Sequence, residues 1–201
     1  MDRNGKKLND TDEMISAVTR VFAEAEAETA AFAAKSGLGC RAGCGDCCNQ
    51  STVETTLSEM LPLAKQLLTD GRAGVVYDAA RAAAGQPCVM FRADASDPTM
   101  GRCSVYELRP LICRLFGFSA INTKTGGSEL ATCKYQKSLM PTAVAKAEAM
   151  AEAGEAPRFA DFAMRLSAAA PSTTSRRIPI NQALAEAIAQ VGLADQLAQQ
   201  P

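Results

Sequence analysis

The sequence predicts a mainly α-helical fold in which helices pack around an irregular, cysteine-rich core, followed by a carboxy-terminal helical segment. Three observations support this prediction. Alanine is abundant, and aromatic residues make up only 5% of the chain of 201 residues. Apolar residues recur at helical spacing near the amino terminus. Glycine then becomes frequent where the cysteines begin, which opposes a helix there and favours a tight loop.

A first helix is expected from Asp10 or Thr11, either of which can cap it, to about Lys35. Its apolar residues recur at the spacing of one helical face; they are Met14, Ile15, Val18, Val21, Phe22, Ala25 and Phe32. We interpret this face as part of the core, the alternative being a docking face for an unidentified protein partner. Gly37 and Gly39 should end the helix and begin the cysteine loop.

Shorter elements are expected in the middle of the chain. They are an extended segment over 51–56, helices over 58–70 and 75–84, a loop or small hairpin over 88–106, a short helix that begins at Pro110, and a turn over 123–127. Ser58 would cap the first of these helices. Proline suits the first turn of the short helix, because the backbone N–H that it lacks has no helical partner there.

The character of the chain changes near Pro141, from where alanine-rich helices are expected over 141–153, 157–169 and 180–199. This part contains no cysteine. We therefore divide the chain into two parts. Residues 1–138 hold the amino-terminal helix and the cysteine-rich region, and residues 139–201 form a helical segment that packs on that core.

Eight cysteines and no histidine occur in the chain. All eight are predicted metal ligands: Cys40, Cys44, Cys47, Cys48, Cys88, Cys103, Cys113 and Cys133. Thiolates bind zinc, iron and copper strongly, and the lack of histidine favours one or two all-thiolate sites. It also excludes mechanisms that need an imidazole. Cys47 and Cys48 would point to opposite sides of an extended backbone, which suits two neighbouring sites or one ligand beside a buried thiol.

Several metals are compatible with this set of ligands. Zinc takes four thiolates tetrahedrally and then stabilises a fold without catalysing a reaction. A [4Fe–4S] cluster also takes four cysteines and adds electron transfer or substrate binding, whereas copper(I) usually has Cys-x-x-Cys or methionine neighbours. The spacing of Cys40, Cys44 and Cys47 also occurs in radical-SAM enzymes. The strand–helix alternation of their barrel is absent from this sequence.

Composition narrows the classes of function. The chain has 21 basic and 22 acidic side chains, a formal net charge of −1, which argues against a nucleic-acid binder. No segment approaches the ~20 apolar residues that span a bilayer, and the polar amino terminus lacks a signal-peptide pattern. We therefore expect a cytoplasmic protein without a membrane partner. Thiols stay reduced in the cytoplasm, so metal sites are favoured over disulfides.

The cysteine motifs resemble those of a known family. They are Cys40-x3-Cys44-x2-Cys47-Cys48, Cys88-x-x-Phe91 and Gly101-x-Cys103-x-x-Tyr106-Glu107-x-Arg109-Pro110-x-x-Cys113-Arg114-x-Phe116. In order and spacing they are similar to the bacterial YkgJ-type, or CxxCxxCC, cysteine-cluster family, whose domain is described as zinc- or iron-chelating. The resemblance runs from Cys40 to about Cys133. One departure is Val89-Met90, where relatives often carry Pro-Phe.

The resemblance implies metal binding more firmly than it implies a reaction. It assigns ligand roles to the seven cysteines from Cys40 to Cys113, with Cys133 as the eighth. One similar branch, the flagellin lysine methylases, carries the same cluster and an iron–sulfur centre, which favours iron over zinc. Two alternatives follow from it. One is an iron–sulfur enzyme that acts on a protein side chain by methyl-transfer or redox chemistry, and the other is a zinc-stabilised adaptor.

Side chains close to the cysteines are candidates for supporting roles. Arg109 and Arg114 lie inside the motif and could donate to sulfur, which would offset the negative charge of a thiolate site. We interpret Arg41 and Arg102 as surface residues. The aromatic residues near the cysteines are expected either to exclude water from the site or to fill a small core; they are Phe91, Tyr106 and Phe116.

Overall fold

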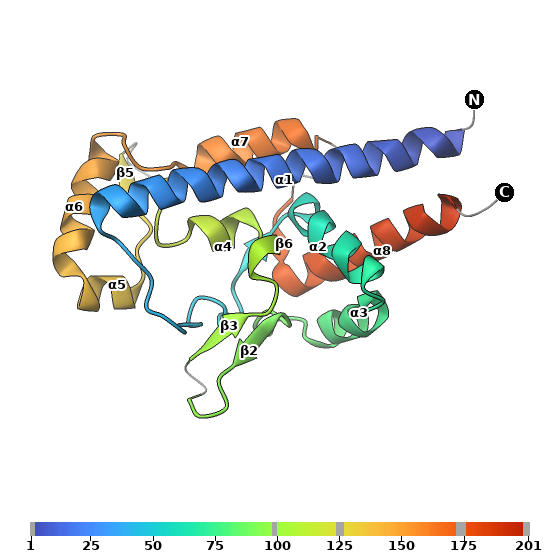
Figure 1. The fold of residues 1–201 in the computed structure, drawn as a ribbon, viewed down its shortest axis with the longest axis horizontal. Helices are drawn as coiled ribbons and strands as arrows, with labels where there is room; N and C mark the ends of the chain where they lie inside the picture. Colours follow the sequence, from blue (N-terminus) through green and yellow to red (C-terminus); the bar gives the residue numbers. More distant parts are fainter. Residues whose placement is uncertain (1–2, 98–99, 124–126, 172–175, 199–201) are drawn as a thin grey trace.

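The computed structural model describes residues 3–97, 100–123, 127–171 and 176–198, and of residues 3–10 and 197–198 it describes only the backbone. Its helices are α1 (Arg3–Ser36), α2 (Leu57–Thr69), α3 (Ala73–Ala82), α4 (Leu111–Leu115), α5 (Lys134–Leu139), α6 (Pro141–Glu152), α7 (Phe159–Ala169) and α8 (Ile180–Ala198), with a 3₁₀ turn at Tyr106–Leu108. Its strands are β1 (Glu54–Thr55), β2 (Phe91–Ala93), β3 (Gly101–Cys103), β4 (Ala120–Asn122), β5 (Ser128–Leu130) and β6 (Ile178–Pro179). The prediction of a mainly α-helical fold with a carboxy-terminal helix is confirmed (Figure 1).

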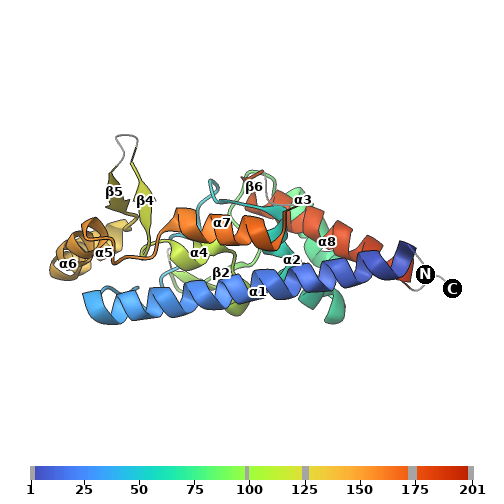
Figure 2. The same cartoon turned by 90° about the horizontal axis from the view of Figure 1, so that it is seen from above.

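The long helix α1 runs along one side of the molecule, and α7 lies beside it (Figures 1 and 2). Its apolar face is buried, as the helical spacing predicts, with Val18 and Ala25 fully inaccessible. The predicted start at Asp10 or Thr11 is wrong, because the helix already begins at Arg3. No proline or glycine pair separates the polar first residues from the apolar stripe, so the helix continues through them. It ends at Ser36, and Gly37 then takes the left-handed conformation (φ 78°) that favours glycine.

Helix α2 is capped by Thr56 rather than by Ser58. Thr56 Oγ1 accepts from the Glu59 backbone N–H (3.4 Å), and Glu59 Oε1 accepts in return from the Thr56 N–H (3.1 Å). This reciprocal pair is a capping box, which satisfies two backbone donors at the start of a helix. Ser58 instead lies in the first turn, with its hydroxyl 3.0 Å from Thr56 Oγ1. The pattern Thr-x-x-Glu was therefore the better signal in the sequence.

The largest apolar cluster joins α2 and α3 to the carboxy-terminal helix α8. Leu61 and Leu67 of α2 lie in the same cluster as Leu184 and Val191 of α8, and all four are at most 1% exposed. Strands β1 and β6 pair antiparallel just before α2 and α8, with Thr55 opposite Ile178. The last helix of the chain is therefore built into the same core as the segment that follows the cysteine loop.

Two smaller clusters extend the core along α1. One lies between α1, α4 and α7 and includes Phe22, Leu115 and Phe162. The other lies where the end of α1 meets α6 and the β4–β5 hairpin, around Phe32 and Ala147. Helix α5 and the β4–β5 hairpin are not among the elements that the sequence predicts. The hairpin surrounds the predicted 123–127 turn, of which residues 124–126 lie outside the described part, as does the last residue of the helix predicted over 180–199.

The predicted β hairpin over 88–106 is present as β2 and β3, which pair antiparallel with Phe91 opposite Cys103. The short helix predicted at Pro110 is present as α4, with Cys113 and Arg114 inside it; Pro110 stands at the extended position just before the helix and not in its first turn. In the described part of the chain, no helix is both long enough and apolar enough to cross a bilayer.

Glu59 connects two elements that lie far apart in the sequence. Its carboxylate is 1% exposed, and its second oxygen accepts from the backbone N–H of Leu111 at 2.7 Å, which ties α2 to α4. Glu59→Ala should lower the free energy of unfolding by roughly 3 kcal/mol, because each buried donor left without an acceptor costs ~1–3 kcal/mol. Urea unfolding followed by circular dichroism measures this loss. Glu148→Ala, at an exposed position of α6, is the control and should change it little; an equally small effect of both substitutions would contradict the assignment.

Candidate metal centre

The cysteine loop follows α1 and is built from tight turns. The Cys44 N–H donates to the Arg41 carbonyl oxygen (3.1 Å), and the Cys48 N–H donates to the Gly45 carbonyl oxygen (2.9 Å). Gly43 takes a left-handed conformation between the two turns (φ 68°). The expectation of an extended backbone at Cys47 and Cys48 is wrong. Both residues lie in a turn, and both line the same cavity.

The cysteine loop approaches the β2–β3 hairpin closely, and glycines leave room on both sides of the contact. The Gly101 N–H donates to the Gly43 carbonyl oxygen at 2.9 Å. A Cβ atom on Gly101 would lie 2.5 Å from the Arg92 carbonyl oxygen, and one on Gly45 would overlap the Phe91 ring. A side chain at Gly45 would therefore push the loop away from the hairpin, whereas one at Gly101 would disturb the pairing of β3 with β2. The contact brings the loop thiols beside the hairpin that carries Cys103.

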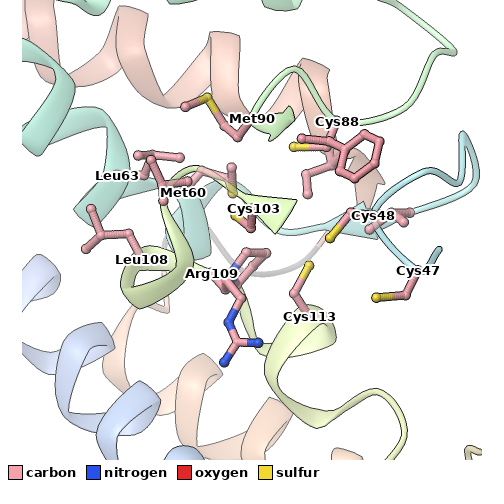
Figure 3. Close-up of a pocket in the computed structure, with 15 residues that line it drawn as sticks. Cys47, Cys48, Met60, Leu63, Cys88, Met90, Cys103, Leu108, Arg109 and Cys113 are labelled. Carbon is pink, nitrogen blue, oxygen red and sulfur yellow. The ribbon is translucent and has the colours of Figure 1, made fainter. Parts of the chain in front are cut away.

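Five of the eight predicted ligands line one cavity between the loop, the hairpin and α4 (Figure 3). They are Cys47, Cys48, Cys88, Cys103 and Cys113. The other lining residues are apolar except for Arg109, and they come from the segment before β1, from α2, from the hairpin and its flanks, from the turn before α4 and from the start of α8; they are Val53, Met60, Leu63, Met90, Phe91, Val105, Leu108, Pro110 and Ile180. No side chain that lines this cavity in the described part of the chain carries a carboxylate or a hydroxyl group.

The apolar surroundings control the protonation of the thiols. Burial raises the pKa of Cys88, Cys103 and Cys113 above the ordinary value of a thiol, and neighbouring sulfurs raise that of Cys113 further. Cys48 donates a hydrogen bond to the Cys47 sulfur, which raises its own pKa and lowers that of Cys47 to about 7. Bound metal would supply the positive charge that stabilises the thiolates, so its binding would release protons.

Cys40, Cys44 and Cys133 lie outside the cavity. Cys133 begins α5, where its sulfur accepts from the Gln136 backbone N–H at 3.4 Å. Cys40 lies in the exposed part of the loop. All eight cysteines are free thiols, and in the described part of the chain no three Cys, Asp or Glu side chains converge on one point as the ligands of a single metal ion do. The structure thus separates the predicted ligands into a cavity group and an outer group.

The two arginines of the motif both pair with the Glu26 carboxylate on α1, Arg109 at 3.3 Å, but otherwise have different surroundings. Arg109 lines the cavity, and its positive charge opposes the rise in the pKa of Cys103 and Cys113 that burial causes. Its guanidinium stacks on Tyr106, 3.4 Å from the ring centre, and its buried Nε has no hydrogen-bond acceptor among the described residues. An unpaired donor at this position could donate a hydrogen bond to a metal-bound sulfur of the neighbouring thiols.

Arg114 instead holds the chain that carries Arg109. Its Nε donates to the Arg109 carbonyl oxygen at 2.8 Å, and its Nη1 lies 2.8 Å from a carboxylate oxygen of Glu26 on α1. A third donor, Nη2, reaches the Glu107 carbonyl oxygen. Arg114 does not line the cavity, so its contacts with the metal centre would be indirect.

The aromatic residues near the cysteines shield the site less than expected. Phe91 lines the cavity, whereas Tyr106 is 54% exposed and Phe116 is 40% exposed. Aliphatic and methionine side chains take most of that role; Met60 comes from α2, between the motif cysteines, and Ile180 comes from α8, far beyond the motif in the sequence. Nothing in the local sequence indicates that these residues approach the cysteines.

Asn181 at the start of α8 is a supporting residue that sequence reasoning missed. Its Oδ1 accepts from the Val89 backbone N–H at 3.0 Å, and its Nδ2 donates to the carbonyl oxygens of Ala83, Gln86 and Pro87. The side chain is 2% exposed and holds the segment that carries Cys88. The available signal was a pair of amide side chains, Asn181 and Gln182, at the start of an otherwise apolar helix.

The fold and the cavity define a small helical protein whose loops gather thiols from four separate segments. The profile of the CxxCxxCC family, described as "Putative zinc- or iron-chelating domain", matches residues 39–139, about half of the chain. The chain belongs to this family, which supports metal binding in general. Neither the curated proteins nor the solved structures contain a match to it.

The close approach of the loop to the hairpin can be tested with a pair of glycine substitutions. Gly45→Ala should destabilise the protein by roughly 1–3 kcal/mol, because its methyl group would overlap the Phe91 ring and lie 3.0 Å from the Gly101 backbone carbon. Gly74→Ala in α3 has open space and should stabilise by about 0.5–1 kcal/mol. Thermal unfolding of both variants checks the signs, and a stable Gly45→Ala protein with unchanged thiol reactivity would disprove the close contact.

Proposed function

We propose that this protein binds a [4Fe–4S] cluster in the thiol cavity, with Cys48, Cys88, Cys103 and Cys113 as its ligands. The observation that carries the proposal is the convergence of these thiols, from four separate segments, on a cavity with an otherwise apolar wall. Membership of a zinc- or iron-chelating family supports metal as the ligand. The fifth thiol of the cavity, Cys47, is exposed, which suits a position at its edge.

The arrangement of the sulfurs favours a cluster over a single ion. Zinc needs four sulfurs at ~2.3 Å from one point. In a [4Fe–4S] cluster each thiolate binds a different iron, so the ligand sulfurs stand further apart around a larger volume. Among the described residues the thiols line the walls of the cavity and do not converge on one point. A structural zinc ion is the alternative outcome of the experiment below.

The chain would provide ligands, exclusion of water and a fixed positive charge. When bound, the cluster would supply one-electron chemistry. Met60, Leu63 and Met90 are each 1% exposed and would keep water from it. The described lining contains no carboxylate or hydroxyl group to act as an acid or base, so the proposal extends to electron transfer rather than to acid–base catalysis. A reducing cytoplasm would keep the eight free thiols available.

Removal of one cavity ligand tests the proposal. Protein purified under argon should be brown, should bleach with dithionite and should contain iron and sulfide. Cys113→Ser should lose nearly all cluster iron, because it removes the ligand that α4 provides. Ile112→Val on the same helix is the control and should keep the iron. Metal analysis and the visible spectrum measure the change. If the wild-type protein is colourless and holds one zinc ion that Cys113→Ser loses, the cavity binds zinc and not a cluster. If Cys113→Ser and Cys88→Ser both keep their full iron content, the cavity is not the metal site.

Arg109 should raise the reduction potential of the cluster, because a nearby positive charge stabilises the reduced, more negative state. Arg109→Gln should lower the potential by tens of millivolts, on a scale where about 59 mV corresponds to a tenfold change for one electron. Arg81→Gln removes the same charge from an exposed position of α3 and is the control. Potentiometric titration measures the reduction potential of both variants. Equal potentials in Arg109→Gln and Arg81→Gln would show that the charge of Arg109 does not act on the cluster.

A further inference from the structure

A carboxylate of the long helix α1 contacts the cysteine motif, although α1 lies outside the matched family domain. Helix α1 ends at Ser36, and the family profile begins to match at residue 39. One oxygen of the Glu26 carboxylate lies 2.8 Å from Arg114 Nη1 and 3.3 Å from Arg109 Nη2. Glu26 therefore bridges both arginines of the motif. In the described part of the chain, no other acidic side chain forms an ion pair with either of them.

The buried position of Arg114 requires a negative charge at this point of α1. The Arg114 side chain is 5% exposed, and its guanidinium lies over the Phe22 ring, 4.8 Å from the ring centre. Burial lowers the pKa of Arg114, and the positive charge of Arg109 lowers it further, whereas Glu26 opposes both effects. Neighbouring guanidinium groups repel each other most strongly where little water screens their charges. Glu26 offsets this repulsion and so allows the two arginines to stand side by side.

Arg109 is held by contacts on several sides, and Glu26 provides the one at the end of the side chain. Tyr106 covers a face of the guanidinium, and the Arg109 carbonyl oxygen accepts from Arg114 Nε at 2.8 Å. A guanidinium is planar and its donors point in fixed directions. The contact of Nη2 with Glu26 therefore also fixes the direction of Nε, which is buried and has no acceptor in the described part of the chain. The side chain held in this way lines the thiol cavity.

We propose that Glu26 is a positioning residue for the metal centre, which anchors Arg109 and Arg114 to α1 and thereby fixes the charge of Arg109 beside the cavity. Glu26 itself does not line the cavity, so it acts on the centre only through the arginines. Without this anchor, the Arg109 side chain would be free to turn away from the thiols, and its charge would act on the cluster less. The inference rests on the proposed function as far as the cluster is concerned, whereas the anchoring of the motif to α1 needs no metal.

A double-mutant cycle on the reduction potential tests the positioning role. Potentiometric titration measures the change that Arg109→Gln causes, once in the wild-type background and once in the Glu26→Ala background. The change should be less than half as large in the Glu26→Ala background, because Arg109 is no longer held at the cavity. Glu24→Ala is the matched control, since Glu24 lies on the same helix and pairs with Arg165 instead. In that background the effect of Arg109→Gln should be the same as in the wild type.

Thermal unfolding adds a measurement that does not depend on the cluster. Glu26→Ala should lower the unfolding midpoint by roughly 3–6 °C, because it leaves the buried Arg114 without a counter-charge. Glu24→Ala should lower the midpoint by about 1 °C or less, because it removes only an exposed ion pair. Should Glu26→Ala fail to fold, Glu26→Asp takes its place in both measurements. It keeps the charge but is one methylene shorter, so it withdraws the carboxylate from the arginines.

The outcomes separate this inference from the proposed function. If Arg109→Gln changes the potential equally in the wild-type and Glu26→Ala backgrounds, or in neither, Glu26 does not position Arg109, and the cluster stands. If the wild-type protein holds no cluster, the proposed function fails and thermal unfolding decides the anchoring. A larger loss in Glu26→Ala than in Glu24→Ala then supports the anchor on α1, and equal losses overturn it.

Discussion

The close contact between the cysteine loop and the β2–β3 hairpin is the constraint on which the rest of the thiol cluster depends. Its centre is the hydrogen bond from the Gly101 N–H to the Gly43 carbonyl oxygen. The contact needs glycine at position 45, because a side chain there would meet the Phe91 ring of the hairpin. Without this approach Cys47 and Cys48 would lie apart from Cys103, and no cavity with several thiols would exist.

Buried polar side chains position the remaining thiols, and they do so across long separations in the sequence. Glu59 holds the start of α4, two residues before Cys113, by accepting the Leu111 N–H. Asn181 holds the segment around Cys88 through four backbone groups. In both cases a helix of the main core, α2 or α8, supplies the polar group. The packed helices therefore hold the loops that carry the cysteines in place. The cavity is irregular in backbone conformation but attached to rigid elements, which favours a defined ligand geometry.

Much of the fold could be predicted from local pattern, whereas the division of the thiols could not. The apolar stripe of α1 and the alanine-rich stretches of α6 and α7 have clear helical periodicity, and the structure contains these helices. The cap of α2 was misplaced because Ser58 was preferred over Thr56, although Glu59 completes a capping box only with Thr56. Cys47 and Cys48 were assigned an extended backbone, because the turn at Gly45 depends on hydrogen bonds that spacing does not reveal.

Long-range contacts explain why the site could be predicted only as a set of residues. The motif identified all the thiols, but their grouping depends on where α5 and the hairpin pack, and α5 is short and has no strong periodicity. The two groups meet at Cys47 and Cys48, whose side chains share a hydrogen bond. Metal bound to Cys48 in the cavity would displace the proton that Cys48 donates to the Cys47 sulfur, so the state of Cys47 would depend on whether the cavity is occupied.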